Sequence, residues 1–349
     1  MKKQFTMSLC VLLGTALLTG CGSLSGTAKG KEYVTDASSS ASASASVSTS
    51  SATAATSINP SDISEPDIAA SAVSAASAAT AVSISTMDDS ALNIVFLGDS
   101  QFDNARGTGS SIPELVAQKT GGNCYNLAVG GTAASLSREQ KNIGYDQWTD
   151  PNFTGVVNVL AGNVSSGIFG SYAAGSVLSQ IDVKKVDYYV LDYGVNDYFN
   201  GTQIFNQDQN GDQSTYVGAM RTGISNLKNL SPNAKIVICS PAYALFYNSD
   251  HVYIGDGNMV DKGAGPLKDY ASSAQNLASE SGALYLDTYY GTAFDLDQNT
   301  ADQFLQDGIH FTERGRRVYA AALARIINKD LGTDTSEPSV LQIESSDFN

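Results

Sequence analysis

Charged residues are scarce in this chain. They make up 16% of its 349 residues, whereas soluble domains usually contain about a quarter. Something other than charge must therefore keep part of the chain in solution. Lys and Arg number 20 against 35 Asp and Glu, which leaves a formal net charge of −15. A nucleic-acid binder needs clustered basic side chains, so this balance argues against that function.

Cysteine and histidine are also rare. Four Cys in a chain of this length exclude a small scaffold held together by disulfides. We expect Cys124 and Cys239 at opposite ends of their strands, so we predict two small core residues and no disulfide. With only two His in the chain, an imidazole base has to be His251 or His310. The 42% of hydrophobic residues still suffices for a large core and excludes a wholly disordered chain.

No long apolar run is present at the N-terminus. Lys2 and Lys3 precede an apolar stretch from Phe5 to Leu18, and Thr-Gly-Cys21 follows it. A basic head, about a dozen apolar residues and small residues before a cut site are typical of a secretory signal, here residues 1–20. A transmembrane helix needs about 20 apolar residues, so an anchor of that kind is the weaker alternative.

The end of this segment resembles the bacterial lipobox. The residues are Leu18-Thr-Gly-Cys21, and the resemblance implies cleavage before Cys21 and attachment of lipid to its sulfur. An ordinary secretory signal with an incidental Cys is the alternative. We therefore expect a lipoprotein on the extracellular face of the cell membrane, which contacts the membrane only through lipid at Cys21.

Residues 21–90 carry almost no large apolar side chains. About two-thirds of residues 37–86 are Ala or Ser, and such a segment cannot offset the entropy cost of ordering. We predict a flexible tether. The alternative is a weak Ala-rich helix, which Pro60 and Pro66 disfavour. The acidic residues 333–349 are predicted to form a flexible tail, which leaves 91–332 as one folded domain.

The domain alternates short apolar runs with segments of helical spacing. Five runs predict buried strands, at 92–97, 125–129, 186–191, 234–239 and 283–287. Helical spacing is found at 112–119, 214–230, 266–281 and 312–331. The alternation predicts an α/β fold, with a five-stranded parallel sheet covered by helices on both faces. The longest connection, 132–175, is expected to be functional, because long loops in compact domains usually are.

Four polar clusters follow predicted strands or lie near the C-terminus. They are Gly98-Asp-Ser100, Asn126 to Gly131, Gly194-Val-Asn196-Asp197 and Asp307-Gly-Ile-His310. Ligands of open parallel sheets bind at the carboxyl ends of the strands, so we expect the clusters to meet at one rim. They combine a hydroxyl nucleophile, an imidazole three residues from a carboxylate, a Gly N–H and an Asn amide. These are the groups that nucleophilic acyl transfer requires.

In this order, the four blocks resemble the SGNH (GDSL-type) hydrolase family, and the resemblance covers essentially all of 91–332. It implies a flavodoxin-like three-layer α/β/α fold and hydrolysis of acyl esters with no cofactor and no metal. It also implies that Ser100 is the nucleophile and that His310 takes its proton and then protonates the leaving alcohol. Asp307 is implied as the carboxylate that orients the imidazole.

The resemblance also implies an oxyanion hole. Its donors would be the N–H of Ser100, the N–H of Gly131 and the side-chain amide of Asn196. Gly131 is preferred to Gly130 because the Gly of the family usually lies five residues after an Asn, and Asn126 fits that spacing.

Several of these residues have structural interpretations too. Taken alone, Ser100 could be a helix N-cap after a strand. His251 has no Asp at the expected spacing and is the weaker candidate for the base. Asp99 is expected to bond the backbone of its turn, and Asp197 to brace the loop that holds Asn196.

The substrate is less well determined by the sequence. Tyr193, Tyr198, Tyr243 and Tyr247 fall near the predicted rim, where rings could stack on sugars or form ordinary core. A tethered surface enzyme would meet polymers outside the cell, so we favour O-acetyl groups on a polysaccharide. A lipase or lysophospholipase is the competing enzyme, although no exposed apolar run is evident. A non-catalytic glycan-binding lipoprotein on the same fold is the non-enzyme alternative.

One polar segment resembles a calcium loop. Residues Asn206–Asp212 alternate oxygen-bearing side chains and contain a Gly, but Val217 stands where the twelfth ligand would be. We favour a polar turn and predict no metal. The expected partner is an acylated small molecule or polysaccharide, with no nucleic acid, and the protein is expected to be a monomer.

Overall fold

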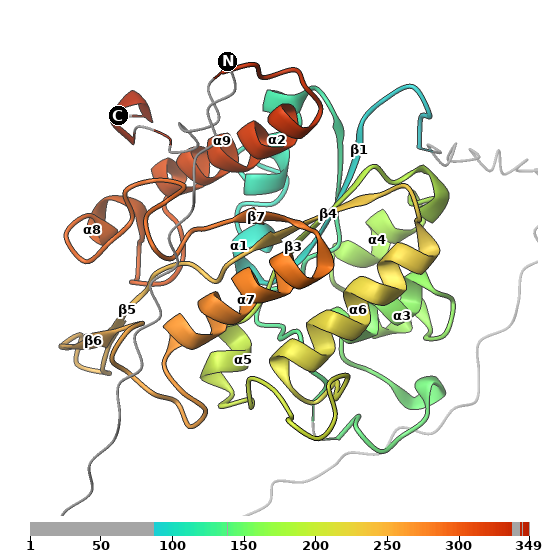
Figure 1. Cartoon of the computed structure of the whole chain (residues 1–349), viewed down its shortest axis with the longest axis horizontal. Coiled ribbons are helices and arrows are strands. Elements are labelled where there is room, and N and C mark those ends of the chain that lie inside the picture. Colours follow the sequence, from blue (N-terminus) through green and yellow to red (C-terminus); the bar gives the residue numbers. More distant parts are fainter. Residues whose placement is uncertain (1–86, 138, 337–342, 344, 349) are drawn as a thin grey trace, which may run out of the picture. The chain divides into compact units, whose positions relative to one another are not determined.

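The computed structural model describes residues 87–137, 139–336, 343 and 345–348. At its centre lies a five-stranded sheet in which every neighbouring pair is parallel (Figure 1). Its strands are, in spatial order, β2 (Asn123–Asn126), β1 (Asn93–Gly98), β3 (Tyr188–Asp192), β4 (Lys235–Cys239) and β7 (Leu284–Leu286). If these five strands are numbered 1 to 5 along the chain, their spatial order is 2-1-3-4-5, which is the order of flavodoxin-like sheets. The predicted α/β fold with five parallel strands is confirmed.

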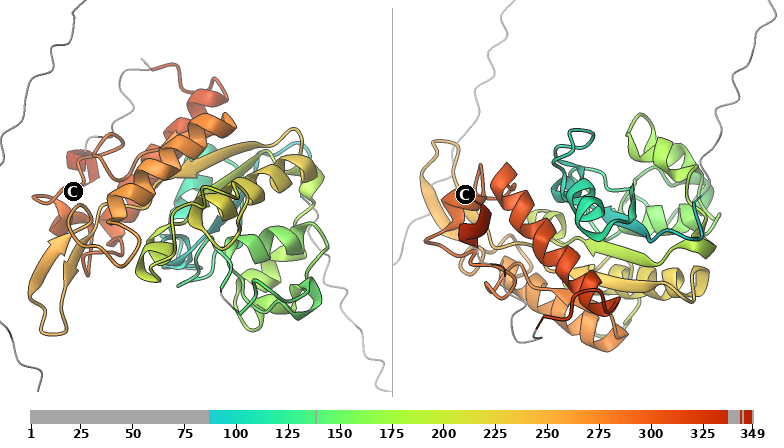
Figure 2. Two further views of the ribbon diagram at one scale, coloured as in Figure 1. Left: turned by 60° about the horizontal axis from the view of Figure 1, so that its bottom comes forward. Right: turned by 90° about the horizontal axis from the view of Figure 1, so that it is seen from above.

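Helices cover both faces of the sheet. On one face, α2 packs on α9 and β2, and α9 packs on β7. On the other, α3 packs on β1, α7 packs on β4 and β7, and α6 lies between α3 and α7 (Figures 1 and 2). Their bounds are α2 (Ile112–Thr120), α3 (Phe153–Leu160), α6 (Tyr216–Leu230), α7 (Leu267–Ser281) and α9 (Glu313–Asp330). Because both faces are covered, every residue of β1 and β3 is buried.

The shorter elements carry no periodicity of their own and were not predicted. Four are single helical turns: α1 (Ser100–Asp103), α4 (Ala174–Leu178), α5 (Val195–Phe199) and α8 (Ala301–Phe304). Four are 3₁₀ turns: η1 (Tyr145–Gln147), η2 (Ser166–Phe169), η3 (Val183–Lys185) and η4 (Ser345–Phe348). The two remaining short elements are the strands β5 (Leu245–Tyr247) and β6 (Tyr253–Asp256). They form an antiparallel hairpin, which projects from the domain beside α8 (Figures 1 and 2).

Both ends of the described chain pack further than the predicted boundaries. Met87 is buried, and the carbonyl of Asp88 accepts a hydrogen bond from the Asn93 side chain, so these residues belong to the fold rather than to the tether. Near the C-terminus, the Ile343 N–H donates to the Ala293 carbonyl at 2.8 Å. Ile343 is therefore packed on the domain, while the flexible tail predicted for residues 333–349 stays a prediction. The signal segment, Cys21 and the Ala/Ser-rich stretch lie outside the described residues.

The two described cysteines are unbonded. Cys124 on β2 and Cys239 on β4 are separated by β1 and β3, and burial raises the pKa of both thiols. They are small core residues, as predicted. Within the part of the chain that the structure covers, no helix has the length and apolar character needed to cross a bilayer.

Candidate active site

β1 places Ser100 at the carboxyl edge of the sheet. The strand ends at Gly98, Asp99 caps the following turn, and Ser100 is the first residue of α1. The Asp99 carboxylate accepts the Gln101 N–H at 3.0 Å, which is the backbone-bonding turn expected for it. Because a first helical residue has no carbonyl partner within its helix, the Ser100 N–H is left available for a ligand.

Ser100, His310 and Asp307 form a hydrogen-bonded triad. His310 Nε2 lies 3.0 Å from Ser100 Oγ, and His310 Nδ1 lies 2.6 Å from Asp307 Oδ2. The other carboxylate oxygen, Asp307 Oδ1, accepts the N–H groups of Ile309 at 3.0 Å and of His310 at 2.7 Å. One carboxylate thus shapes the 307–310 turn and orients the ring. This geometry allows the imidazole to take the proton of Ser100.

Asp307, the carboxylate of this triad, stays charged. Partial burial acts to raise the pKa of Asp307, but hydrogen bonds from the His310 ring, the His310 N–H and the Ile309 N–H outweigh it. The net effect is a pKa below the ordinary value for Asp. An ionised Asp307 can stabilise the imidazolium that forms when Ser100 loses its proton.

Gln101 joins the nucleophile turn to the histidine loop. Its side chain is buried, and its Nε2 donates to the Ile309 carbonyl at 2.9 Å. Its Oε1 accepts the Phe311 N–H at 3.4 Å. Sequence analysis did not identify this residue. The only local signal is a polar side chain directly after Ser100, at a position that begins a buried turn.

Of the two candidate glycines, one N–H is already occupied. The Gly130 N–H donates to Asp103 Oδ2 at 3.0 Å. The Gly131 N–H has no acceptor among the described residues, and an added Cβ at Gly131 would meet open space. Its φ of +79° is a conformation that favours glycine. This geometry favours Gly131 over Gly130 as a donor to a ligand.

Arg106 holds the segment that carries these glycines. Its Nε donates to Asp103 at 2.8 Å, and its two terminal nitrogens donate to the carbonyls of Asn126 at 2.8 Å and Ala128 at 2.7 Å. Asp103 in turn accepts from Gly130. The end of β2 is thereby fixed relative to the turn of the nucleophile, a contact that no sequence motif indicated.

Both hydrogens of the Asn196 amide have acceptors. Nδ2 lies 3.0 Å from Asp99 Oδ2 and 3.1 Å from the Thr132 carbonyl. Asn196 lies on α5, directly after β3, so the structure brings it to the same rim as Ser100. Burial raises the pKa of Asp99 to about 7, partly offset by the Gln101 N–H, the charge of His310 and the Asn196 amide.

Asp197 braces the segment that holds Asn196 by bonding it to a second loop. Its carboxylate is buried and accepts the N–H groups of Ala134 at 2.8 Å and Ser135 at 3.1 Å. It therefore ties α5 to the loop after Gly131. Burial raises its pKa, and these hydrogen bonds reduce that effect.

The remaining candidates separate clearly. His251 lies in the exposed turn of the β5–β6 hairpin and has no hydrogen bond to Ser100 or Asp307. Tyr193, Tyr198 and Tyr243 are buried core residues, whereas Tyr247 is 44% exposed. The structure thus divides the four tyrosines that the sequence had grouped.

The calcium-like segment is an internally bonded turn. The Asn206 amide donates to Asp212 Oδ2 at 2.8 Å, and Asp212 Oδ1 accepts both the N–H and the hydroxyl of Ser214. Burial would raise the pKa of Asp212, but these bonds and the charge of Lys141 lower it to about 2. Its oxygens are thus used to shape the start of α6, in agreement with a polar turn.

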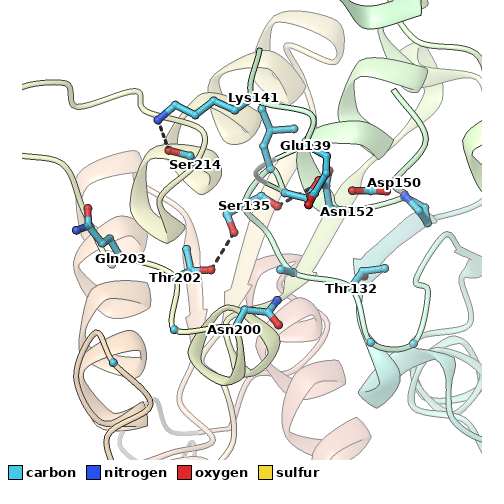
Figure 3. Close-up of a pocket in the computed structure, with 18 of the residues that line it drawn as sticks. Thr132, Ser135, Glu139, Lys141, Asp150, Asn152, Asn200, Thr202, Gln203 and Ser214 are labelled. Carbon is cyan, nitrogen blue, oxygen red and sulfur yellow. Dashed lines mark hydrogen bonds between the residues drawn. The ribbon is translucent and has the colours of Figure 1, made fainter. Parts of the chain in front are cut away.

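A polar pocket of about 840 Å³ opens beside Gly130 and Gly131 (Figure 3). Three hydrogen bonds join its walls: Ser135 Oγ to Thr202 Oγ1 at 3.4 Å, Lys141 Nζ to Ser214 Oγ at 2.8 Å, and Asn152 Nδ2 to the Ser135 carbonyl at 3.1 Å. The polar side chains that Figure 3 labels are Thr132, Ser135, Glu139, Lys141, Asp150, Asn152, Asn200, Thr202, Gln203 and Ser214. The long connection after residue 132 therefore forms much of the pocket beside the site.

The sequence matches one family of known proteins. The model of the GDSL-like lipase/acylhydrolase family matches residues 96–318. The chain therefore belongs to the GDSL-like lipase/acylhydrolase family, and it is a carboxylic ester hydrolase by class. No curated protein matches its sequence.

Several solved structures are similar to this chain at low identity. One covers 70% of this chain and 99% of its own, with 17% identity and a TM-score of 0.52. A possible lipase from Chitinophaga pinensis covers 70% of this chain and 100% of its own, with 16% identity and a TM-score of 0.47. An acetyl xylan esterase from Geobacillus stearothermophilus covers 70% and 97%, with 16% identity and a TM-score of 0.39.

Proposed function

We propose that the protein is a surface-anchored serine esterase that removes O-acetyl groups from a carbohydrate polymer. The observation that carries the proposal is the hydrogen-bonded line from Ser100 Oγ through His310 to Asp307. In this proposal Ser100 is the nucleophile, His310 the general base and acid, and Asp307 the orienting carboxylate.

The reaction runs in two halves. Ser100 Oγ attacks the acetyl carbon while its proton passes to His310 Nε2, and the carbonyl electrons move onto the oxygen. When the C–O bond to the sugar breaks, Nε2 returns the proton to the leaving alcohol, which leaves acetyl-Ser100. Water then attacks this ester with the help of His310, which releases acetate and restores Ser100.

The negative oxygen needs donors, and three groups are near. We assign the N–H groups of Ser100 and Gly131 and the amide of Asn196 to this oxyanion hole. Both Asn196 hydrogens already have acceptors, at Asp99 and at the Thr132 carbonyl. The amide therefore has to exchange the neutral Thr132 carbonyl for the oxyanion, while Asp99 keeps the other hydrogen.

The polar pocket supports a carbohydrate rather than a fatty acyl ester. Its labelled side chains are hydroxyls, amides, carboxylates and one ammonium (Figure 3). A long acyl chain would desolvate these groups without giving them hydrogen-bond partners, whereas sugar hydroxyls would both donate and accept. An acetyl group needs no long acyl channel.

A lipase is the second candidate, because part of the surface is apolar. Val252, Ile254 and Met259 on and after the β5–β6 hairpin are each about half exposed or more. Sequence analysis had found no such run. The acyl preference separates the two candidates, since a lipase would favour long acyl chains.

The test is acetate release from acetylated xylan, pectin and peptidoglycan, alongside p-nitrophenyl acetate, butyrate and octanoate. We expect acetate to be preferred and Ser100→Ala to abolish turnover. A steep preference for octanoate would favour the lipase. No turnover of any ester, or an equal rate in Ser100→Ala, would leave only glycan binding on this fold.

Surface anchoring is tested separately. Because the Leu-x-Gly-Cys sequence ends at Cys21, we expect Cys21→Ala to move the protein from the membrane fraction to the medium. Retention of the variant in the membrane would contradict lipidation at this residue.

A further inference from the structure

The β5–β6 hairpin packs directly on the loop that carries Asp307 and His310. The Leu245 N–H donates to the Gly308 carbonyl at 2.8 Å. A Cβ built on Gly308 would lie 3.0 Å from the ring of Tyr247 and 2.3 Å from the Leu245 carbonyl oxygen. Tyr247 therefore covers the residue between Asp307 and Ile309.

Two aromatic rings form the exposed face of this hairpin. Tyr247 and Tyr253 are paired across the strands, and their ring centroids are 6.0 Å apart in an edge-to-face arrangement. The exposed fractions of Tyr247 and Tyr253 are 44% and 40%. Phe246, the residue before Tyr247, is buried and stacks on Tyr198. Buried tyrosines are ordinary core, but a pair left in solvent beside a catalytic loop is not required for packing.

The chemistry of the reaction determines which part of the ester lies here. His310 Nε2 has to protonate the leaving oxygen, so the alcohol part of the ester lies on the His310 side of Ser100. The hairpin packs on the loop of His310. Tyr247 and Tyr253 therefore adjoin the alcohol rather than the acyl group.

From these contacts we propose that Tyr247 and Tyr253 form a platform that binds a sugar ring of the alcohol part of the substrate. The proposal rests on the esterase function above and adds a binding subsite to it. A tyrosine offers a flat apolar face and a hydroxyl, which together match the C–H face and the hydroxyls of a pyranose.

The charges around the platform favour a neutral sugar over a membrane. Residues 245–256 contain no Lys or Arg, and Asp250 lies in the turn. An anionic lipid surface attracts basic segments, so this hairpin lacks that attraction. Val252 and Ile254 flank Tyr253 in sequence and are also exposed, so the hairpin carries apolar as well as aromatic side chains.

The experiment compares polymer and small ester in the full-length protein. The variants are Tyr247→Ala, Tyr253→Ala and their double, with Tyr247→Phe as the variant that keeps the ring. Tyr290→Ala, an equally exposed tyrosine after β7, is the matched control. The substrates are the acetylated glycan with the highest kcat/KM and ethyl acetate, which has no ring.

We expect the double variant to lower the ratio of kcat/KM for the glycan to that for ethyl acetate by roughly tenfold, mainly through KM. Tyr247→Phe should keep most of the ratio, and Tyr290→Ala should leave it unchanged. An unchanged ratio in the double variant would overturn the platform. So would a loss of binding to phosphatidylcholine vesicles in the double variant with intact glycan kinetics, since that result assigns the hairpin to lipid.

A binding measurement separates this proposal from the esterase function. In a Ser100→Ala background, the Kd for the deacetylated oligosaccharide of the same glycan should rise about tenfold when both tyrosines are replaced. If no ester is hydrolysed by the parent protein, the same measurement over xylan, pectin and peptidoglycan fragments still decides the platform. Equal binding with and without the rings would refute it.

Discussion

Gln101, the residue after Ser100, donates from its side chain to the Ile309 carbonyl at 2.9 Å. It also accepts the Phe311 N–H, so the two peptide groups on either side of His310 are bonded to one buried side chain. The separation of Ser100 Oγ and His310 Nε2 therefore depends on a contact between residues 208 positions apart. Four predictions follow from contacts of this kind around the site.

Gln101→Leu keeps the volume of the side chain and removes both hydrogen bonds. We expect kcat to fall by roughly 10- to 100-fold with little change in KM, because small misplacement of a catalytic group costs that much. Steady-state kinetics on p-nitrophenyl acetate measure the effect. Gln101→Glu keeps the acceptor for Phe311 and should be less impaired. Gln118→Leu, at an exposed position of α2, is the control. A kcat equal to that of the control would refute a positioning role.

Arg106→Lys removes the three-way contact to Asp103, Asn126 and Ala128. A single ammonium cannot reach all three acceptors, so the segment that carries Gly131 should lose its fixed position. We expect kcat/KM and the affinity for a phosphonate transition-state analogue to fall together by about tenfold. Arg317→Lys, on the exposed side of α9, should change neither. Weakened kcat/KM with unchanged analogue affinity would argue against this role.

Asn196→Ala removes one donor of the proposed oxyanion hole. We expect kcat to fall by about 100-fold or more, with KM little changed, as is usual for the loss of one such donor. Asn196→Asp keeps the shape but not the hydrogens and should be no better. Circular dichroism and thermal unfolding show whether either variant is folded. A folded alanine variant that retains nearly full kcat would exclude the amide from the oxyanion hole.

Asp99 should make stability depend on pH. Burial raises its pKa from 3.8 to about 7, so between these values the folded protein holds a proton that the unfolded chain releases. The free energy of unfolding therefore falls as pH rises through this window, because the folded state binds more protons. Asp99→Asn removes this titration. We expect the difference in unfolding midpoint between parent and variant to change between about pH 4 and about pH 7, and parallel pH curves would contradict the raised pKa.

Sequence patterns predicted the parts of this structure that depend on local periodicity and on sheet topology. β1, β3 and β4 are buried apolar runs, whereas β2 is the polar segment Asn123–Asn126 and begins two residues before the predicted strand at 125–129. The carboxyl ends of parallel strands share one edge. For that reason the placement of Ser100 and Asn196 at one rim could be inferred without coordinates. His310 and Asp307 share one turn, so their pairing needed only a spacing of three residues.

Contacts between distant segments were not predictable in the same way. Gln101 and Arg106 follow Ser100 closely in the sequence, but their hydrogen-bond partners are set by how the domain packs. The β5–β6 hairpin was missed because three of its seven strand residues are exposed and a bulge interrupts its pairing, so it shows neither an apolar run nor strict alternation. The packing of Ile343 and Met87 was missed because composition describes a segment and not its neighbours.

The order of the catalytic residues along the chain has a consequence for biosynthesis. Ser100 and His310 are 210 residues apart, and among the described elements α9 and η4 follow His310. Strand β7 completes the sheet late, and α9 then packs against α2 near the start of the domain. Any nascent or truncated chain that ends before residue 307 thus contains a nucleophile without its base. Ester hydrolysis by these three residues can begin only after the chain has been synthesised through His310 and the loop of Asp307 has met the end of β1.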